Sequence, residues 1–185
     1  MGPSIKLSNR IILRVENEAS AQNVLNLYLR NKTAFEQFEP TRPADFYTKD
    51  YHSAMLRREY KAYQLGTFLR YYIYRTTNPN RIIGSVNFNL MHDTTMPFAE
   101  IGYKVDSLYQ NQGIGYEACQ IGISVIKQNY GINRIDARIH PDNLPSLRLA
   151  EKLGFTPVRL EPQSANILGH YVDLIRYSLS TSDTQ

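Results

Sequence analysis

The stretch from Ile114 to Tyr130 limits what this chain can fold into more than any other part of it. Apolar residues would occupy almost every side of a helix formed here, at Ala118, Cys119, Ile121, Ile123, Val125 and Ile126. A helix that is apolar nearly all round lies buried against other structure, here a sheet. Strand-like segments stand on both sides of it, at Glu100–Val105 and Arg134–Ile139. This order predicts a strand–helix–strand crossover within an α/β chain.

The rest of the pattern extends this prediction to a mixed sheet with helices on both faces. We expect further strands over Ile11–Val15, Thr67–Arg75, Arg81–Leu90, Thr156–Leu160 and His170–Leu179, and helices over 21–28, 50–65 and 143–153. Ser20 is expected to cap the first helix, and Asn78-Pro79-Asn80 to form a tight turn. No stretch resembles an interdomain linker, so residues 1–185 are expected to form a single domain.

Composition excludes several classes of protein. The net charge is +4, but Lys and Arg form no stripe, which argues against direct nucleic-acid readout. No apolar run approaches the roughly 20 residues that span a membrane. The single cysteine, Cys119, allows no intramolecular disulfide and fits a cytoplasmic location. The four histidines have no metal-ligand spacing, so no metal is expected.

A glycine-rich segment directly precedes the apolar helix. It reads Gln110-Asn111-Gln112-Gly113-Ile114-Gly115-Tyr116-Glu117-Ala118. Glycines let backbone N–H groups approach a ligand, and a helix start adds unpaired amides and a partial positive charge. Together these features favour a phosphate site. The segment is neither a Walker loop nor a complete dinucleotide fingerprint, and a glycine-rich turn without a ligand remains the alternative.

A second motif opens the next expected helix, with Asn143-x-x-Ser146 at its start and Leu153-Gly154-Phe155 at its end. Asn143 is suited to an N-cap, and Gly154 to the position after the C-cap. Capping alone would explain these residues. It would not explain why this helix follows the glycine-rich one at this distance.

The two motifs in this order resemble the GCN5-related N-acetyltransferase (GNAT) superfamily. Three further features are similar to the ribosomal-protein N-acetyltransferases, which modify N-terminal serine or alanine: Ile101-Gly102-Tyr103, Glu117-Ala118 and Asn143-x-x-Ser146. The resemblance is strongest over residues 100–155. It implies a splayed mixed sheet and acetyl-CoA as cosubstrate.

The resemblance also assigns residues to the cosubstrate. The loop residues Gln110, Asn111, Gln112, Gly113, Ile114, Gly115 and Tyr116 would hold its pyrophosphate. Tyr103 and Val105, on the strand that splays in this family, would lie beside its pantetheine arm, which Asn143 would also contact. Gln112 stands where the superfamily often has a basic residue.

The transfer itself needs a neutral amine and a proton for the departing sulfur. A free α-amine has a pKa of about 8, so modest assistance suffices. The resemblance implies Glu100 as the base and Ser146 as the acid, with direct transfer and no covalent enzyme intermediate. The alternatives are that Glu100 is a solvent-facing carboxylate and that Ser146 only satisfies its helix's first turn.

The acceptor is the least defined part of the prediction. The resemblance favours the N-terminal α-amine of a protein, in particular a ribosomal protein. A small amine, such as a polyamine, aminoglycoside or amino acid, is the alternative, and so is an idle acyl-CoA-binding module. Lys104 must point away from an amine acceptor for either reaction. The sequence leaves open whether the chain forms a homodimer.

Overall fold

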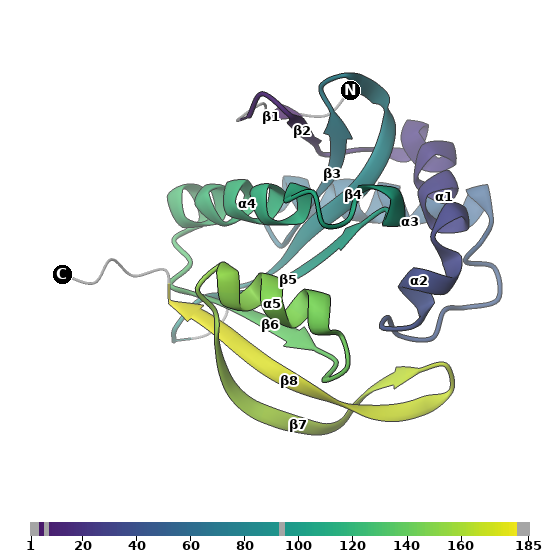
Figure 1. Cartoon of the computed structure of the whole chain (residues 1–185). Coiled ribbons are helices and arrows are strands. Elements are labelled where there is room, and N and C mark those ends of the chain that lie inside the picture. Colours follow the sequence, from purple (N-terminus) through teal and green to yellow (C-terminus); the bar gives the residue numbers. More distant parts are fainter. Residues whose placement is uncertain (1–3, 6–7, 93–94, 181–185) are drawn as a thin grey trace.

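The apolar stretch forms helix α4 (Ile114–Tyr130), which lies across one face of a sheet (Figure 1). The computed structural model describes residues 4–5, 8–92 and 95–180. Within them, α4 follows strand β5 (Phe98–Val105) and precedes strand β6 (Arg134–Ile139). These two strands run parallel, so the predicted crossover is confirmed.

The described strands form one eight-stranded mixed sheet in the order β1-β2-β3-β4-β5-β6-β8-β7. The other strands are β1 (Ser4–Ile5), β2 (Ile11–Arg14), β3 (Phe68–Arg75), β4 (Asn78–Met91), β7 (Thr156–Ile167) and β8 (His170–Ser180). Every neighbouring pair except β5 and β6 is antiparallel. The α/β fold class with a mixed sheet is therefore confirmed.

Helices cover both faces of the sheet, as predicted (Figure 1). Helix α5 (Leu144–Lys152) lies on the same side as α4. Helices α1 (Ala21–Arg30), α2 (Lys32–Glu36) and α3 (Lys49–Gln64) lie on the other side or beside it. Two single turns, at Glu18–Ser20 and Ser107–Tyr109, precede α1 and follow β5.

Each side of the sheet has its own core. The larger core lies under α4 and contains Phe88, Ile101, Cys119 and Ile126 among its buried residues. The smaller core joins α1 and α3 to the sheet through residues such as Tyr28 and Leu56. His52 is buried there and stacks on Tyr28, and burial lowers its pKa to about 4.

Strands β5 and β6 separate soon after they begin. Their ladder has three residue pairs, of which Glu100 with Asp136 is the last. Beyond this pair β5 continues to Val105 and β6 to Ile139. Residues 101–105 stay paired with β4 on their other side. The sheet is therefore splayed between β5 and β6, and one edge of β5 has no strand partner there.

Two local predictions were wrong, namely the place of the β3–β4 turn and the Ser20 cap. Arg75 pairs with Asn78, so the β3–β4 turn is Thr76-Thr77 instead of Asn78-Pro79-Asn80. Pro79 lies in an irregular part of the ladder, where its missing N–H breaks no strand bond.

Ser20 precedes α1 as expected but makes no side-chain cap. Its hydroxyl donates to Glu16 at 2.5 Å instead, and Asn17 caps the single turn that runs into α1. Helix α2 and strand β1 were not predicted.

Candidate functional site

Helix α4 begins with an open N-terminus. Gly113 is its N-cap residue, with a left-handed φ of 76° and no side-chain cap bond. A residue with a β-carbon would lose about 1–2 kcal/mol in this conformation. The N–H groups of a helix's first turn have no partners within the helix. This end of α4 therefore presents free amides and the positive end of the helix dipole.

The side chains of the preceding loop hold it to β5 and do not fill the helix end. Gln110 donates to the carbonyl oxygen of Val105 at 3.2 Å, and Gln112 donates to that of Leu108 at 3.0 Å. Asp106 accepts from the N–H of Leu108 at 3.1 Å. These bonds fix the start of the loop relative to the splayed strand.

Gly115 marks the point where β5, α4 and α5 come together. A β-carbon at Gly115 would lie 3.3 Å from Val105 and 3.4 Å from Leu149. Glycine therefore allows the start of α4 to approach both the end of β5 and the side of α5. The neighbouring Tyr116 lies beside α5 as well, with the ammonium of Lys152 4.6 Å from its ring centroid.

Tyr103 and Ser146 meet on the side of β5 that faces α4 and α5. The Tyr103 hydroxyl donates to the backbone carbonyl oxygen of Ser146 at 3.0 Å. The Ser146 hydroxyl donates in turn to the hydroxyl oxygen of Tyr103, also at 3.0 Å. Asn143 caps the first turn of α5 by accepting from the N–H of Ser146. The Ser146 hydroxyl is thus directed to Tyr103 and not to its helix. Burial raises the pKa of Tyr103, which therefore stays protonated.

Glu100 lies on the opposite side of β5. Its side chain accepts from Nε and Nη2 of Arg138 on β6, at 3.1 and 2.8 Å, through the same oxygen, Oε1. Glu100 belongs to the last pair before the strands separate, and this ion pair links the two strands beyond that point. Glu100 and Ser146 therefore flank the splay from opposite faces of the sheet.

Lys104 shares the face of Glu100 but is engaged by other groups. Its ammonium lies 2.7 Å from a carboxylate oxygen of Glu39 and 3.1 Å from the Tyr28 hydroxyl. Lys104 therefore points to the α1–α2 layer, where it shares the Glu39 carboxylate with Arg42.

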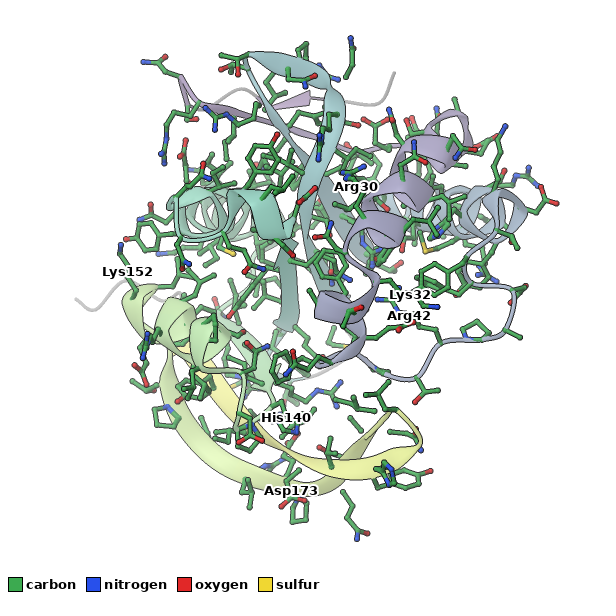
Figure 2. All side chains as sticks on the ribbon, turned by 45° about the vertical axis from the view of Figure 1, so that its right-hand side comes forward. Arg30, Lys32, Arg42, His140, Lys152 and Asp173 are labelled. Atoms are coloured by element: carbon green, nitrogen blue, oxygen red, sulfur yellow. The ribbon has the colours of Figure 1, made fainter. Side chains whose placement is uncertain are left out.

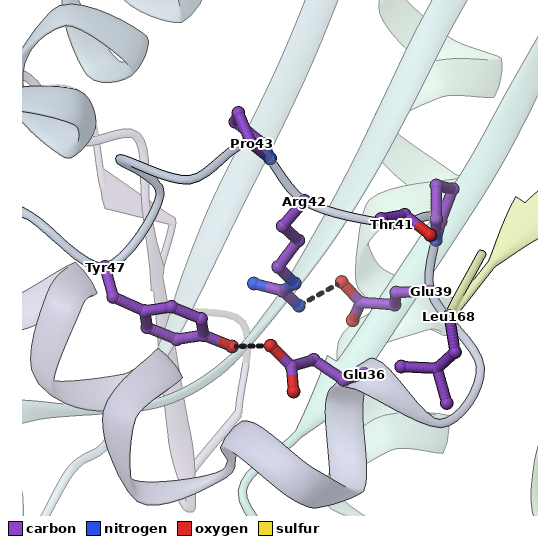
Figure 3. A pocket seen from close by; sticks show the side chains of 8 residues that line it. Glu36, Glu39, Thr41, Arg42, Pro43, Tyr47 and Leu168 are labelled. Carbon is purple, nitrogen blue, oxygen red and sulfur yellow. Dashed lines mark hydrogen bonds and ion pairs between the residues drawn. The ribbon is translucent and has the colours of Figure 1, made fainter.

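A pocket of about 240 Å³ lies next to this contact (Figure 3). Its walls are Glu36, Glu39, Pro40, Thr41, Arg42, Pro43, Tyr47 and Leu168. Figure 3 shows Arg42 turned to Glu39 and Tyr47 turned to Glu36; both contacts measure 2.7 Å. Arg42 also stacks on Phe46, with 4.0 Å to the ring centroid. No local pattern in the sequence indicates that Glu36 and Glu39 line one pocket.

The loop between α2 and α3, residues 37–48, reaches the far end of the sheet. Thr41 bonds Asn166 by backbone and side chain, at 2.8 and 2.7 Å. Phe38 contacts His140, just after β6, at 5.6 Å between ring centroids. Figure 2 shows Arg42 on one side of this region, with His140 and Asp173 on the side of the β7–β8 hairpin.

Other candidate chemistry has less support in the structure. Cys119 is buried, and burial raises the pKa of its thiol. No group of three or more His, Cys, Asp or Glu residues in the described chain could hold a metal ion. No helix within residues 4–5, 8–92 and 95–180 is long and apolar enough to cross a membrane.

Most of the predicted site residues therefore gather around one place, where β5 ends, α4 begins and α5 passes. Sequence reasoning missed Arg10, which bonds the glycine-rich loop, and Arg138, which bonds Glu100. Both contact residues distant in the sequence, so no local pattern could have revealed them.

Comparison with known proteins agrees with this geometry. Residues 10–156 match the model of a family described as the acetyltransferase (GNAT) domain. The probable N-acetyltransferase YjcK of Bacillus subtilis (strain 168) is 28% identical over 171 residues, covering 88% of this chain and 90% of that protein.

Many solved structures share the fold. The ribosomal-protein-S5-alanine acetyltransferase of Vibrio fischeri superposes with a TM-score of 0.90 at 22% identity, covering 99% of both chains. RimJ of Mycobacterium smegmatis, in complex with a CoA-disulfide, has a TM-score of 0.85 at 20% identity, covering 92% of this chain and 82% of that one.

Proposed function

This chain belongs to the GNAT acetyltransferase family, and we propose that it transfers acetyl from acetyl-CoA to the N-terminal α-amine of a protein, with a ribosomal protein as the favoured acceptor. The transfer is direct, without a covalent enzyme intermediate. The proposal retains the cytoplasmic location expected from the sequence.

The observation that carries the proposal is the open helix end beside an unpaired strand edge. The free amides of α4 suit a pyrophosphate, which carries negative charge and accepts hydrogen bonds. The edge of β5 beyond Glu100 offers backbone groups to an extended, amide-containing arm. A ligand in which a pyrophosphate is joined to an extended, amide-containing arm fits this arrangement. Acetyl-CoA is such a ligand.

The residues around the splay could supply the groups that the reaction needs. Glu100 accepts the proton that the amine loses, directly or through water, because Arg138 binds only one of its two oxygens. A backbone N–H on the free edge of β5 stabilises the charge that develops on the acetyl oxygen. On the other side of the sheet, the Ser146 hydroxyl, which donates to the Tyr103 hydroxyl, turns to protonate the departing sulfur and takes a proton back from solvent.

The acceptor enters, in this proposal, on the face of Glu100 and Lys104. Glu36 and Glu39 together balance the charges of Lys104 and Arg42 around this pocket, so an amine meets no net positive charge there. The pocket beside it gives room for the residues that follow the reacting amine. The V. fischeri relative, named for acetylating an alanine of ribosomal protein S5, supports a protein acceptor.

Calorimetric titration with acetyl-CoA, CoA and ATP tests the cosubstrate. We expect both CoA compounds to bind and ATP not to bind. The absence of binding to either CoA compound at near-millimolar concentration would refute the proposal. Peptides that begin with Ser or Ala, compared with polyamines, aminoglycosides and amino acids, then test the acceptor. Faster turnover of small amines would replace the protein acceptor, and binding without turnover of any amine would indicate an idle acyl-CoA-binding module.

A further inference from the structure

Arg10 joins three parts of the chain at the glycine-rich loop before α4. It lies just before β2, more than 100 residues from the loop in sequence. Its Nη1 donates to the carbonyl oxygen of Gln112 at 3.1 Å. Its Nε donates to Oε2 of Glu117 at 2.9 Å, and its Nη2 forms an ion pair with the same carboxylate. The guanidinium thus links the loop to the first turn of α4.

These contacts fix the direction in which one amide points. The carbonyl of Gln112 and the N–H of Gly113 belong to one planar trans peptide, so they point in opposite directions. Because Arg10 binds the carbonyl, the Gly113 N–H is directed away from Arg10. The next peptide is held as well, because the Gly113 carbonyl accepts from the Glu117 N–H at 3.0 Å.

The charges at the loop indicate that Arg10 acts by orienting the backbone and not by adding net positive charge. The segment 110–117 contains one charged residue, Glu117, and Gln112 is neutral. The ion pair compensates both Arg10 and Glu117. The ammonium of Lys152 is turned to the Tyr116 ring, 4.6 Å from its centroid. The bond from Arg10 also polarises the peptide whose N–H would meet the phosphate.

We infer that Arg10 is a positioning residue for the cosubstrate's pyrophosphate: it orients the Gly113 N–H toward the phosphate through the Gln112 carbonyl, with Glu117 as its support. The inference rests on the proposed function, because it assumes that acetyl-CoA binds at the start of α4. If the inference is right, replacing Arg10 weakens the binding of ligands that carry the pyrophosphate and not of ligands that lack it. Lysine, which lacks the forked guanidinium, should then not replace Arg10. A hydrogen bond from a charged group to the backbone changes an affinity by at most about 10- to 100-fold. The Arg10 side chain is 53% exposed, so the lower end of this range is expected.

The test compares acetyl-CoA with S-acetylpantetheine, a thioester without the pyrophosphate and nucleotide. We expect Arg10→Ala to raise the Kd for acetyl-CoA about tenfold or more and to leave that for S-acetylpantetheine unchanged. Arg10→Lys should fail to restore tight binding, because a single ammonium cannot bond Gln112 and Glu117 as the fork does. Glu117→Gln should raise the acetyl-CoA Kd in the same direction, but less.

Arg14→Ala is the matched control. Arg14 also donates to a backbone carbonyl, that of Pro79 at 2.9 Å, and stacks on Tyr74, but it does not contact the loop. We expect this variant to bind acetyl-CoA as the unaltered protein does. Thermal unfolding of every variant shows whether it is folded. If Arg10→Ala does not fold, Glu117→Gln decides the matter by the same comparison of the two thioesters.

Three results would overturn the inference. Arg10→Ala could weaken both thioesters equally or neither of them, which would show a general structural role or none. Arg10→Lys could bind acetyl-CoA normally, which would show that charge alone matters. The proposed function fails in a different way, since the unaltered protein itself would then not bind acetyl-CoA.

Discussion

Replacing Asp106 with Asn tests how the end of β5 is anchored. Asp106 follows the last residue of β5 and is 1% exposed. It accepts from Arg30 at 3.1 and 3.2 Å, from Arg81 at 3.4 Å and from the Leu108 N–H at 3.1 Å. Asparagine keeps the shape and the bond to Leu108 but removes the charge. We therefore expect it to report on the two ion pairs.

The expected loss follows from the exposure of each partner. Breaking a fully buried ion pair costs about 3–5 kcal/mol, because a charge is left without compensation. The side chains of Arg30 and Arg81 are 32% and 34% exposed, so water would solvate much of their charge in the variant. We expect Asp106→Asn to lower the unfolding free energy by about 2 kcal/mol at pH 7, and the Tm by about 4–8 °C. Urea denaturation and thermal unfolding measure these values.

The pH dependence gives the refuting result. Burial alone would raise the pKa of Asp106, but the Leu108 N–H and the Arg30 guanidinium outweigh burial and hold this pKa below its usual value. A lowered pKa gives stability that is present above the unfolded pKa, about 4, and is lost as the pH falls through the folded pKa. The difference between the two proteins should thus be constant from pH 6 to 8 and shrink below pH 4. The reasoning would be refuted if Asp106→Asn and the unaltered protein had equal unfolding free energies at pH 7. It would also be refuted if the difference between these free energies did not shrink below pH 4. Asp142→Asn, at an 86% exposed side chain, is the control and should change stability by less than about 0.5 kcal/mol.

Three further changes test other parts of the structure. Gly113→Ala should lower the free energy of unfolding by about 1–2 kcal/mol, measured by urea denaturation, because Gly113 has a left-handed φ. It should also weaken acetyl-CoA binding, measured by calorimetry. Unchanged values would contradict the open helix end. Glu100→Gln should lower kcat at least 100-fold with an unchanged acetyl-CoA Kd, whereas a full kcat would exclude Glu100 as the base. Gly122→Ala places a β-carbon 2.7 and 2.9 Å from the buried Phe88 ring, so overpacking of about 1–3 kcal/mol should outweigh the roughly 1 kcal/mol gain in helix propensity. The Tm should fall, and a rise would show that Phe88 moves freely.

The sequence predicted the elements around the site because their signals are local. The bounds of α4 and β6 follow from an apolar stretch and from alternation, and both agree with the structure. The Asn143 cap of α5 was also predicted correctly, since a cap depends on a few adjacent residues. The glycine-rich segment located the open start of α4 for the same reason.

The contacts that complete the site could not be predicted in this way. Arg10 bonds Glu117, and Arg138 bonds Glu100 from another strand. Such pairs depend on how the sheet brings distant segments together, and a single sequence holds no periodic signal for them. The turn at Thr76-Thr77 was missed because Pro79 and its neighbours carry stronger turn chemistry but lie in an irregular strand.

The short β5–β6 ladder has a consequence for how the molecule opens. In the described part of the chain, three ladder pairs and the Glu100–Arg138 ion pair join β5, at the edge of the half that contains β1–β5, to β6, at the edge of the half that contains β6, β8 and β7. Proteins often unfold locally in cooperative units that coincide with supersecondary motifs. A unit that is joined to the rest of the fold by few contacts unfolds at a low free energy. We therefore expect amides of β6, β8 and β7 to exchange with solvent hydrogen through a partial unfolding that spares β3 and β4. A ligand that contacts both β5 and β6 would stabilise the contact between the two halves. Its binding should therefore slow hydrogen exchange at the amides of β6, β8 and β7 to the rate of those in β3 and β4.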